Sequence, residues 1–307
     1  MLSRVFLFLK GMAMGAADVV PGVSGGTIAF ITGIYEELIE SIKSIDKEAL
    51  QKLFKEGIGA FWKHINGTFL VVLFAGILTS VVSLAKGISY LLDTHPILVW
   101  SFFFGLIVAS AVLIGKSVRK WNAATIITLL MGAGIAYYIT VAAPAETSEE
   151  LWFIFLSGAI AICAMILPGI SGSFILLLMG KYKFIIESLS TLNIKVIITF
   201  ALGCFVGILS FSRLLNYMFK HYREATIALL TGFMIGSLNK VWPWKIDLVT
   251  TIDRHGEVVP LQQQSVLPND FPGEPQVIFA TALAVVGFLL IWVLERSTKK
   301  ETIVPDA

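Results

Sequence analysis

Two interruptions of long apolar stretches constrain the fold of this chain most. The segment "PGVSGG" (residues 21–26) separates apolar residues 5–20 from 23–42, and "PGISGS" (168–173) separates 152–167 from 170–189. Proline and glycine end helices, so each stretch is expected to be a helix that breaks there and restarts. The halves before the breaks are shorter than the ~20 residues that cross a bilayer. The sequence therefore predicts two re-entrant hairpins, 5–42 and 152–189.

The rest of the chain is typical of an all-α polytopic membrane protein. It is 56% hydrophobic and only 14% charged, and the net charge of +2 gives no reason to expect a nucleic-acid partner. Cys163 and Cys204 lie in apolar segments, where packing is the expected role and no disulfide framework is implied. Full spans are predicted at 67–90, 97–115, 122–142, 195–217, 225–242 and 276–295.

The two halves of the chain are copies of one unit. Residues 21–41 align with 168–188, and glycines, tyrosines and serines match as well as apolar residues; further on, 75–92 align with 202–219. The first repeat is placed at 1–142 and the second at 143–307. The pattern around the first break also resembles a signal peptide, but the same pattern recurs in mid-chain, which argues against that reading.

The first copy carries extra residues between its matched blocks, within 46–65. Leu50, Phe54, Ile58 and Trp62 follow helical spacing there, with lysines between them. This pattern predicts a helix lying on an anionic membrane surface. A solvated connector that covers the bundle is an equally weighted alternative.

Basic residues indicate the orientation of the spans. Lysines and arginines at 43–63, 116–120, 213–223 and 296–300 are expected on the cytoplasmic side, with the polar loop 245–274 outside. Both termini are then cytoplasmic. Each repeat contains three spans, an odd number, so the second repeat is predicted to be inverted relative to the first. Inverted repeats with broken helices near the midplane are typical of alternating-access carriers.

The restarted helices suggest an anion site. The first turn of a helix presents free N–H groups and partial positive charge, glycine allows close approach, and hydroxyl groups add donors. The alternative is that glycine and proline serve only close helix packing. The predicted phosphate-binding residues are Ser24, Gly25, Gly26, Thr27, Ser171, Gly172 and Ser173.

Charged residues in apolar surroundings supply further candidates. Asp18 precedes the first break and either carries a coupling proton or cation, such as sodium, or caps the restarted helix. Lys181 and Lys183 lie on the predicted outer side, against the usual bias, and could attract a phosphate. Lys86 and Arg213 match between the copies; a phosphate-attracting gate and snorkelling at a helix end are both open for them.

Enzyme signatures are absent from the sequence. No nucleotide-binding loop, GxSxG or metal-spaced histidine pair occurs, so no cofactor, metal or catalytic residue is predicted.

The segments "GAADVVPGVSGGTIAFITGIYEELI", "LPGISGSFILLLMGKY" and "GSLNKVWPW" resemble the bacterial polyprenyl-phosphate transporter family, long catalogued as a domain of unknown function.

The resemblance implies a function and a location. It implies translocation of undecaprenyl phosphate from the outer to the inner leaflet of the bacterial cytoplasmic membrane, for reuse in cell-envelope synthesis. The implied partners are the polyprenyl phosphate and membrane lipids, and oligomeric state is not indicated. The residues alone leave two alternatives: a secondary transporter of a small soluble anion, and a membrane-embedded lipid phosphatase.

Overall fold

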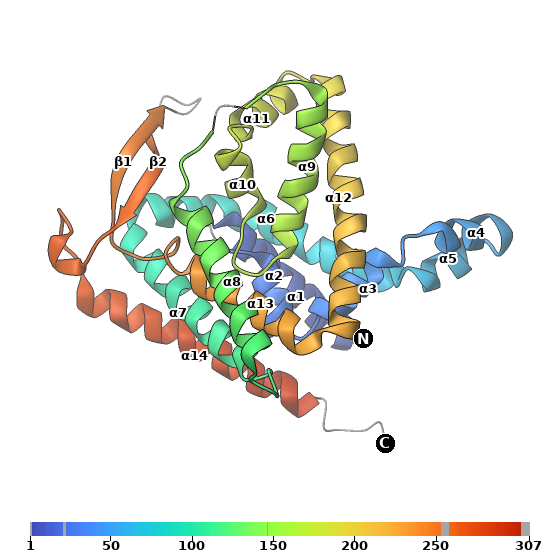
Figure 1. The fold of residues 1–307 in the computed structure, drawn as a ribbon, viewed down its shortest axis with the longest axis horizontal. Helices are drawn as coiled ribbons and strands as arrows, with labels where there is room; N and C mark the ends of the chain where they lie inside the picture. Colours follow the sequence, from blue (N-terminus) through green and yellow to red (C-terminus); the bar gives the residue numbers. More distant parts are fainter. Residues whose placement is uncertain (1, 21–22, 146, 253–257, 302–307) are drawn as a thin grey trace.

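The computed structural model describes residues 2–20, 23–145, 147–252 and 258–301 of the chain. Pro21 and Gly22 of the first break lie outside the described residues, as does 302–307 of the predicted cytoplasmic tail. The first half is helical (Figure 1), with α1 (Leu2–Val19), α2 (Gly25–Ile31), α3 (Tyr35–Lys43), α4 (Lys47–Lys55), α5 (Ile58–His64), α6 (Gly67–Thr94), α7 (Pro96–Gly115) and α8 (Ala123–Val141).

The second half repeats most of this order and adds a small sheet. Its helices are α9 (Leu151–Ile166), α10 (Gly172–Leu178), α11 (Tyr182–Ser190), α12 (Ile194–His221), α13 (Arg223–Ser237) and α14 (Val277–Glu301). Between the last two helices lie β1 (Lys245–Ile252), β2 (Val258–Ser265) and the 3-10 turn η1 (Pro268–Asp270). The order α1, α2, α3, α6, α7, α8 thus corresponds to α9, α10, α11, α12, α13, α14.

Helix pairing follows this correspondence. The most extensive contacts join α1 to α6, α9 to α12, α7 to α14 and α8 to α13. Glycines allow the first two pairs to approach closely: a Cβ at Gly11 or Gly76 would collide with backbone across α1 and α6, and one at Gly158 or Gly203 across α9 and α12. Exchanging the two halves leaves this set of pairs unchanged.

Four predicted spans are confirmed as helices long and apolar enough to cross a membrane: α6, α7, α8 and α12. The other two differ from the prediction. Helix α13 has only 15 residues, because it ends at Ser237 rather than 242. Helix α14 extends beyond its apolar part, Val277–Val293. Exposed large apolar side chains are frequent on α6, α8, α12 and α14, as expected of lipid-facing surfaces.

Each hairpin has one more break than predicted. The stretch 23–42 forms two short helices, α2 and α3, and 170–189 forms α10 and α11. Gly33 (φ +74°) and Gly180 (φ +63°) adopt the left-handed conformation at these turns, which glycine reaches without steric cost. The sequence analysis missed these turns because the residues around them are mostly apolar, although Gly33 and Gly180 occupy matching positions in the alignment of 21–41 with 168–188.

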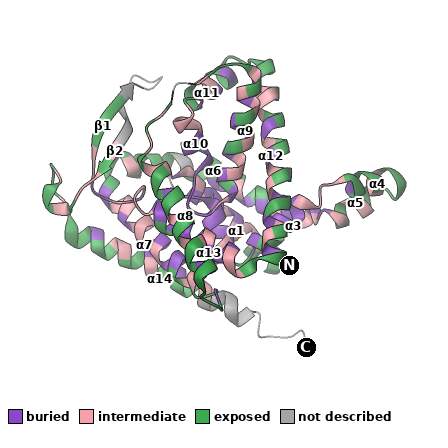
Figure 2. Ribbon diagram, in the orientation of Figure 1, coloured by how far each residue is buried: buried purple, intermediate pink, exposed green. Residues whose placement is uncertain are grey.

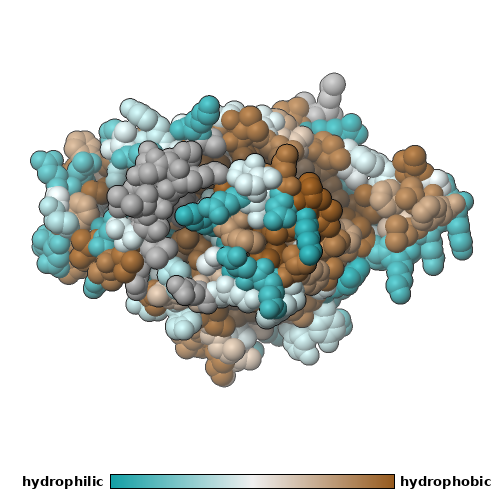
Figure 3. Space-filling model, turned by 90° about the horizontal axis from the view of Figure 1, so that it is seen from above, coloured by the Kyte–Doolittle hydropathy of each residue, from teal (hydrophilic) through white to brown (hydrophobic). Residues whose placement is uncertain are grey.

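The inserted segment 46–65 is two helices rather than one. Helices α4 and α5 meet at Gly57 (φ +91°) and project from the bundle at the right of Figure 1. Leu50, Phe54, Ile58 and Trp62 are exposed on this arm, and Figure 3 shows hydrophobic and hydrophilic atoms side by side there. Exposed apolar side chains beside lysines are compatible with an arm that lies on a membrane surface, which stays a prediction.

The predicted outer loop 245–274 contains the β1–β2 hairpin, which the all-α prediction missed. The strands are antiparallel, with Lys245 opposite Ser265 and Asp247 opposite Gln263. Trp242 and Trp244 tie the adjoining segments together, since their indole N–H groups donate to the carbonyl oxygens of Val266 and Pro275, both at 2.8 Å.

The main buried core lies at the centre of the bundle, where α1, α2, α3, α7 and α13 meet (Figure 2). Val23 of the first break and Ile170 of the second belong to this core. The beginning of α1 and the end of α14 lie at the lower right of Figure 1, and the β1–β2 hairpin lies at the upper left.

Candidate functional site

The two breaks contact each other directly. The Ser24 hydroxyl lies 3.1 Å from the carbonyl oxygens of both Met165 and Leu167 and donates to them. In return, the Gly169 N–H donates to Thr27 Oγ1 at 3.0 Å. Ser24 and Thr27 are almost fully buried. Segments more than 140 positions apart in the sequence therefore form one polar junction inside the core.

Glycines make this junction possible. A Cβ at Gly26 would lie less than 3.0 Å from the Ile166 carbonyl oxygen, and one at Gly172 less than 3.0 Å from that of Ala161. Gly169 has φ +84°, and a Cβ there would press on the Ser237 hydroxyl. A side chain at Gly26 would force the two breaks apart, whereas one at Gly172 would push α10 away from α9 and one at Gly169 would press on α13.

The first restarted helix is satisfied internally. Asp18 Oδ1 accepts a hydrogen bond from the Gly25 N–H at 2.7 Å, and Ser24 Oγ accepts one from the Gly26 N–H at 3.1 Å. The Thr27 N–H donates to the Ser24 carbonyl oxygen at 2.9 Å. A carboxylate is thus the anion at this helix start. Whether Asp18 also carries a proton or cation stays a prediction.

The second restarted helix lacks such a carboxylate, because Met165 stands where the first copy has Asp18. The Ser171 and Ser173 hydroxyls lie 2.9 Å apart, and Ser171 makes no side-chain cap. Ser171 is buried and Ser173 is exposed. A hydroxyl pair with one exposed member and no neighbouring carboxylate suits an anionic ligand better than the first break does.

The predicted cations are not gathered at the junction. Lys181 is buried, donates to the Thr147 carbonyl oxygen at 2.8 Å and lies 5.7 Å from the ring centres of Phe153 and Phe184. Lys183 is exposed and lies 3.9 Å from Glu187. Lys86 and Arg213 are exposed on α6 and α12. Within the described residues, no hydrogen bond joins these four side chains to either break.

A polar pocket beside the second break contains two lysines that the sequence reasoning missed. Its walls come from the ends of α8 and α13, from α10 and from the β1–β2 hairpin; they are formed by Thr140, Ala142, Phe174, Asn239, Lys240, Lys245, Gln263 and Ser265. Phe174 directly follows Ser173. The available signal was the pair of lysines on either side of "VWPW", the first of them within a motif already singled out for its resemblance.

A second cavity is apolar. It has a volume of about 360 Å³ and lies between α11 and α12, lined by Ile185, Ser188, Leu189, Val196, Ile197, Phe200, Ala201 and Cys204. It offers almost no polar group to a phosphate. Its walls suit a hydrocarbon chain instead.

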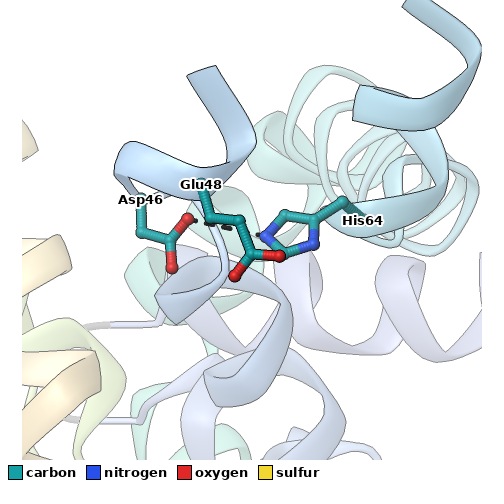
Figure 4. A group of neighbouring side chains, drawn as sticks. All are labelled: Asp46, Glu48 and His64. Atoms are coloured by element: carbon teal, nitrogen blue, oxygen red, sulfur yellow. Dashed lines mark ion pairs between the residues drawn. The ribbon is translucent and has the colours of Figure 1, made fainter. Parts of the chain in front are cut away.

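Asp46, Glu48 and His64 form an acidic cluster on the α4–α5 arm (Figure 4). Their ligand atoms lie within 4.8 Å of one another, which is close enough for one metal ion. However, Lys52 Nζ already lies 3.0 Å from both Glu48 Oε1 and His64 Nδ1. A metal ion there would have to displace an ammonium group, so the cluster fits a metal poorly.

Comparisons with known proteins agree on one family. The sequence model described as VCA0040-like, undecaprenyl phosphate translocase-like, matches residues 14–259. A polyprenyl-phosphate transporter of Vibrio cholerae serotype O1 is 47% identical over 297 residues, covering 95% of this chain and 96% of that protein. A polyprenyl-phosphate transporter of Staphylococcus aureus is 34% identical over 270 residues, covering 80% and 91%. No solved structure matches the chain significantly.

Proposed function

Because this chain belongs to the undecaprenyl phosphate translocase-like family, we propose that it carries undecaprenyl phosphate across the bacterial cytoplasmic membrane, from the outer to the inner leaflet. The observation that carries the proposal is the match to two polyprenyl-phosphate transporters over most of each chain. The returned lipid would serve again in cell-envelope synthesis.

The chemistry of the substrate explains why a protein is needed. A phosphate head loses its hydration in hydrocarbon, and an unpaired charge there is costly by many kcal/mol. The long polyprenyl tail has no such difficulty and can stay in lipid while the head crosses. The apolar cavity between α11 and α12 and the exposed apolar faces of the long helices suit contact with such a tail.

The architecture we propose is an inverted repeat. Hairpins α1–α3 and α9–α11 would enter from opposite sides and meet at the junction of the two breaks, with α6–α8 and α12–α14 as spans. The exchange-symmetric helix pairing and the direct contact of Ser24 with Met165 and Leu167 support this arrangement. Irregular backbone at membrane depth is tolerated where protein surrounds it. Rocking one repeat against the other would open the junction alternately to each side.

We propose that the phosphate passes through the junction and contacts Ser171, Gly172 and Ser173 first. The second break has hydroxyl donors and no carboxylate in the position of Asp18, which supports this order. Ser24, Gly25, Gly26 and Thr27 would take part when the junction opens. The Ser24 hydroxyl then leaves the carbonyl oxygens of the second break and becomes free to donate to phosphate.

Asp18 is the candidate for coupling transport to a proton or sodium ion. As the phosphate approaches Gly25, the Asp18 carboxylate is its competitor for the same N–H group. Two anions at one helix start repel each other, so protonation of Asp18 would favour phosphate entry.

In the proposed topology both termini lie in the cytoplasm and the β1–β2 hairpin lies outside.

The test uses vesicles that contain only this purified protein and undecaprenyl phosphate labelled with ³²P. A membrane-impermeant phosphatase added outside releases phosphate from the outer leaflet alone. In vesicles with the protein, nearly all label should be released, whereas protein-free vesicles should retain about half.

Retention of half the label in the presence of folded protein would overturn the proposed function. Two further readouts test the alternatives. Release of phosphate before any phosphatase is added would indicate a lipid phosphatase. Accumulation of free inorganic phosphate inside the vesicles would indicate a carrier for a small soluble anion.

A further inference from the structure

Lys240 and Lys245 place two ammonium groups in one polar pocket between α10, α8 and the β1–β2 hairpin. Lys245 Nζ donates to the Lys240 carbonyl oxygen at 2.6 Å and lies 4.0 Å from the ring centre of Trp100. Lys240 Nζ lies 4.1 Å from the ring centre of Phe174. With the residues that the structure describes, the Lys240 ammonium makes no hydrogen bond and no ion pair.

The pocket contains no carboxylate to balance these cations. The acidic group that acts on Lys245 is Asp247, which is exposed and whose Oδ1 accepts a hydrogen bond from Gln263. The remaining polar groups form a neutral network: Asn239 donates to Thr140 Oγ1 and accepts from Ser265 Oγ, both at 2.8 Å.

This arrangement is unfavourable without an anion. Burial lowers the pKa of Lys240 to about 8, and burial together with the charge of Lys240 lowers the pKa of Lys245 well below its ordinary value. Two neighbouring cations that are poorly hydrated and lack a counter-ion weaken the fold, and such groups are retained mainly where they have a task.

We propose that Lys240 and Lys245 bind the phosphate monoester of the lipid substrate before it reaches the second break. This inference rests on the proposed function and deepens it by naming a binding site for the headgroup. Phosphate oxygens are strong acceptors for ammonium donors, and Asn239, Ser265 and Thr140 supply neutral polar groups around them.

The position of the pocket fits a receiving site. The ring of Phe174 lies against the Lys240 ammonium, and Phe174 directly follows Ser173, so one wall of the pocket comes from the first turn of the helix that restarts at the second break. The enclosed volume is about 20 Å³, slightly more than one water molecule requires. One phosphate oxygen therefore fits between the lysines, while the rest of the headgroup stays at the pocket mouth.

Lysines elsewhere lack this combination. Lys181 is buried but its ammonium donates to the Thr147 carbonyl oxygen, and Lys183 lies near Glu187. Lys195 is exposed at the start of α12. It provides a matched control, because replacing it removes one positive charge from an exposed position without touching the pocket.

The experiment measures binding of ³²P-labelled undecaprenyl phosphate to the full-length protein in nanodiscs. Lys240→Gln and Lys245→Gln should each weaken binding about ten- to a hundredfold, because each removes hydrogen bonds to a charged group. Lys195→Gln should bind like the wild type. Binding of labelled inorganic phosphate, measured in parallel, separates the lipid headgroup from free phosphate as the ligand.

The outcomes separate this inference from the proposed function. If the wild type transports the lipid and both folded lysine variants bind it normally, the lysine site is wrong and the function stands. Loss of inorganic phosphate binding alone, with lipid binding unchanged, also overturns the headgroup assignment. Thermal unfolding checks the fold, and Lys240→Met, which fills the same space, gives a second variant if Lys240→Gln does not fold.

Discussion

The Ser24 hydroxyl lies 3.1 Å from the Leu167 carbonyl oxygen, although 143 positions separate the two residues in the chain. The bond joins the start of one restarted helix to the end of the helix before the other break. The Ser24 side chain also accepts from the Gly26 N–H. One hydroxyl thus caps its own helix and joins it to the end of α9.

Ser24→Ala should reduce both stability and transport. It leaves the buried Gly26 N–H without its side-chain partner and removes the hydroxyl donor of the Met165 and Leu167 carbonyl oxygens, at about 1–3 kcal/mol. Ser83→Ala is the matched control, since Ser83 is exposed and donates only to Thr79 within α6. Thermal unfolding and the vesicle assay measure the two effects. Wild-type behaviour of Ser24→Ala combined with Ser171→Ala would show that neither hydroxyl serves the junction or the phosphate.

Gly26→Ala and Gly172→Leu should abolish transport, because their side chains would meet carbonyl oxygens of Ile166 and Ala161. In Gly26→Ala the two breaks could then not approach each other, and in Gly172→Leu helix α10 could not pack against α9. Gly59→Ala is the control: nothing lies near a Cβ there, and alanine favours helix α5 by about 0.5–1 kcal/mol. Active, stable Gly26→Ala protein in the vesicle assay would contradict the close approach of the breaks.

The sequence predicted the contact between the breaks only in outline. Matched glycines and serines predicted a duplication, and the extra residues at 46–65 form α4 and α5, which have no counterpart between α11 and α12. The hydrogen bond between Thr27 and Gly169 could not be predicted from the sequence, because it depends on how two distant turns approach each other in space. Periodicity gives the buried face of a helix, not its partner.

Lys240 and Lys245 were missed for a related reason. In sequence they flank an aromatic motif and look like solvated loop residues. They come together only because the segment turns after α13 and starts a β-hairpin, with Lys245 donating to the Lys240 carbonyl oxygen. The hairpin itself was hidden in a polar stretch without a strong alternating pattern.

The proposed topology predicts which positions face the outside. In a chain whose Cys163 and Cys204 are replaced by alanine, single cysteines at Glu149 and Gln263 should react with an impermeant maleimide in intact cells. A cysteine at Lys299 should react only after the cells are permeabilised. Labelling at Lys299 in intact cells, with silence at the other two positions, would reverse the orientation.

Asp18→Asn should separate coupling from capping. The amide oxygen of asparagine can still accept from the Gly25 N–H, which Asp18 Oδ1 contacts at 2.7 Å, so the helix start keeps its cap. Gradient-driven transport should be lost while lipid binding persists. Asp18→Leu, which removes the cap as well, should also destabilise the protein. Full gradient dependence of Asp18→Asn would assign Asp18 to capping alone.

Lys240→Met should stabilise the protein in a pH-dependent way. Burial lowers the pKa of Lys240 to about 8 in the folded protein, against an ordinary value of 10.5. Between these pH values the unfolded chain binds more protons than the folded one, so wild-type stability rises with pH. The penalty is fully present below pH 8, about 3 kcal/mol, and loss of the ring contact with Phe174 in the variant offsets about 1 kcal/mol.

The variant should therefore unfold at a higher temperature than the wild type below pH 8, and this difference should fade towards pH 10.5. Lys245 and Asp247 are the other charged groups that act here, and loss of Lys240 also relieves Lys245 of a neighbouring cation. Bound undecaprenyl phosphate should reverse the order at pH 7, because its charge stabilises two ammonium groups in the wild type and only that of Lys245 in the variant. If the variant and the wild type unfold at the same temperature at pH 7 as well as at pH 10.5, with and without the lipid, Lys240 is neither a buried cation nor a phosphate ligand.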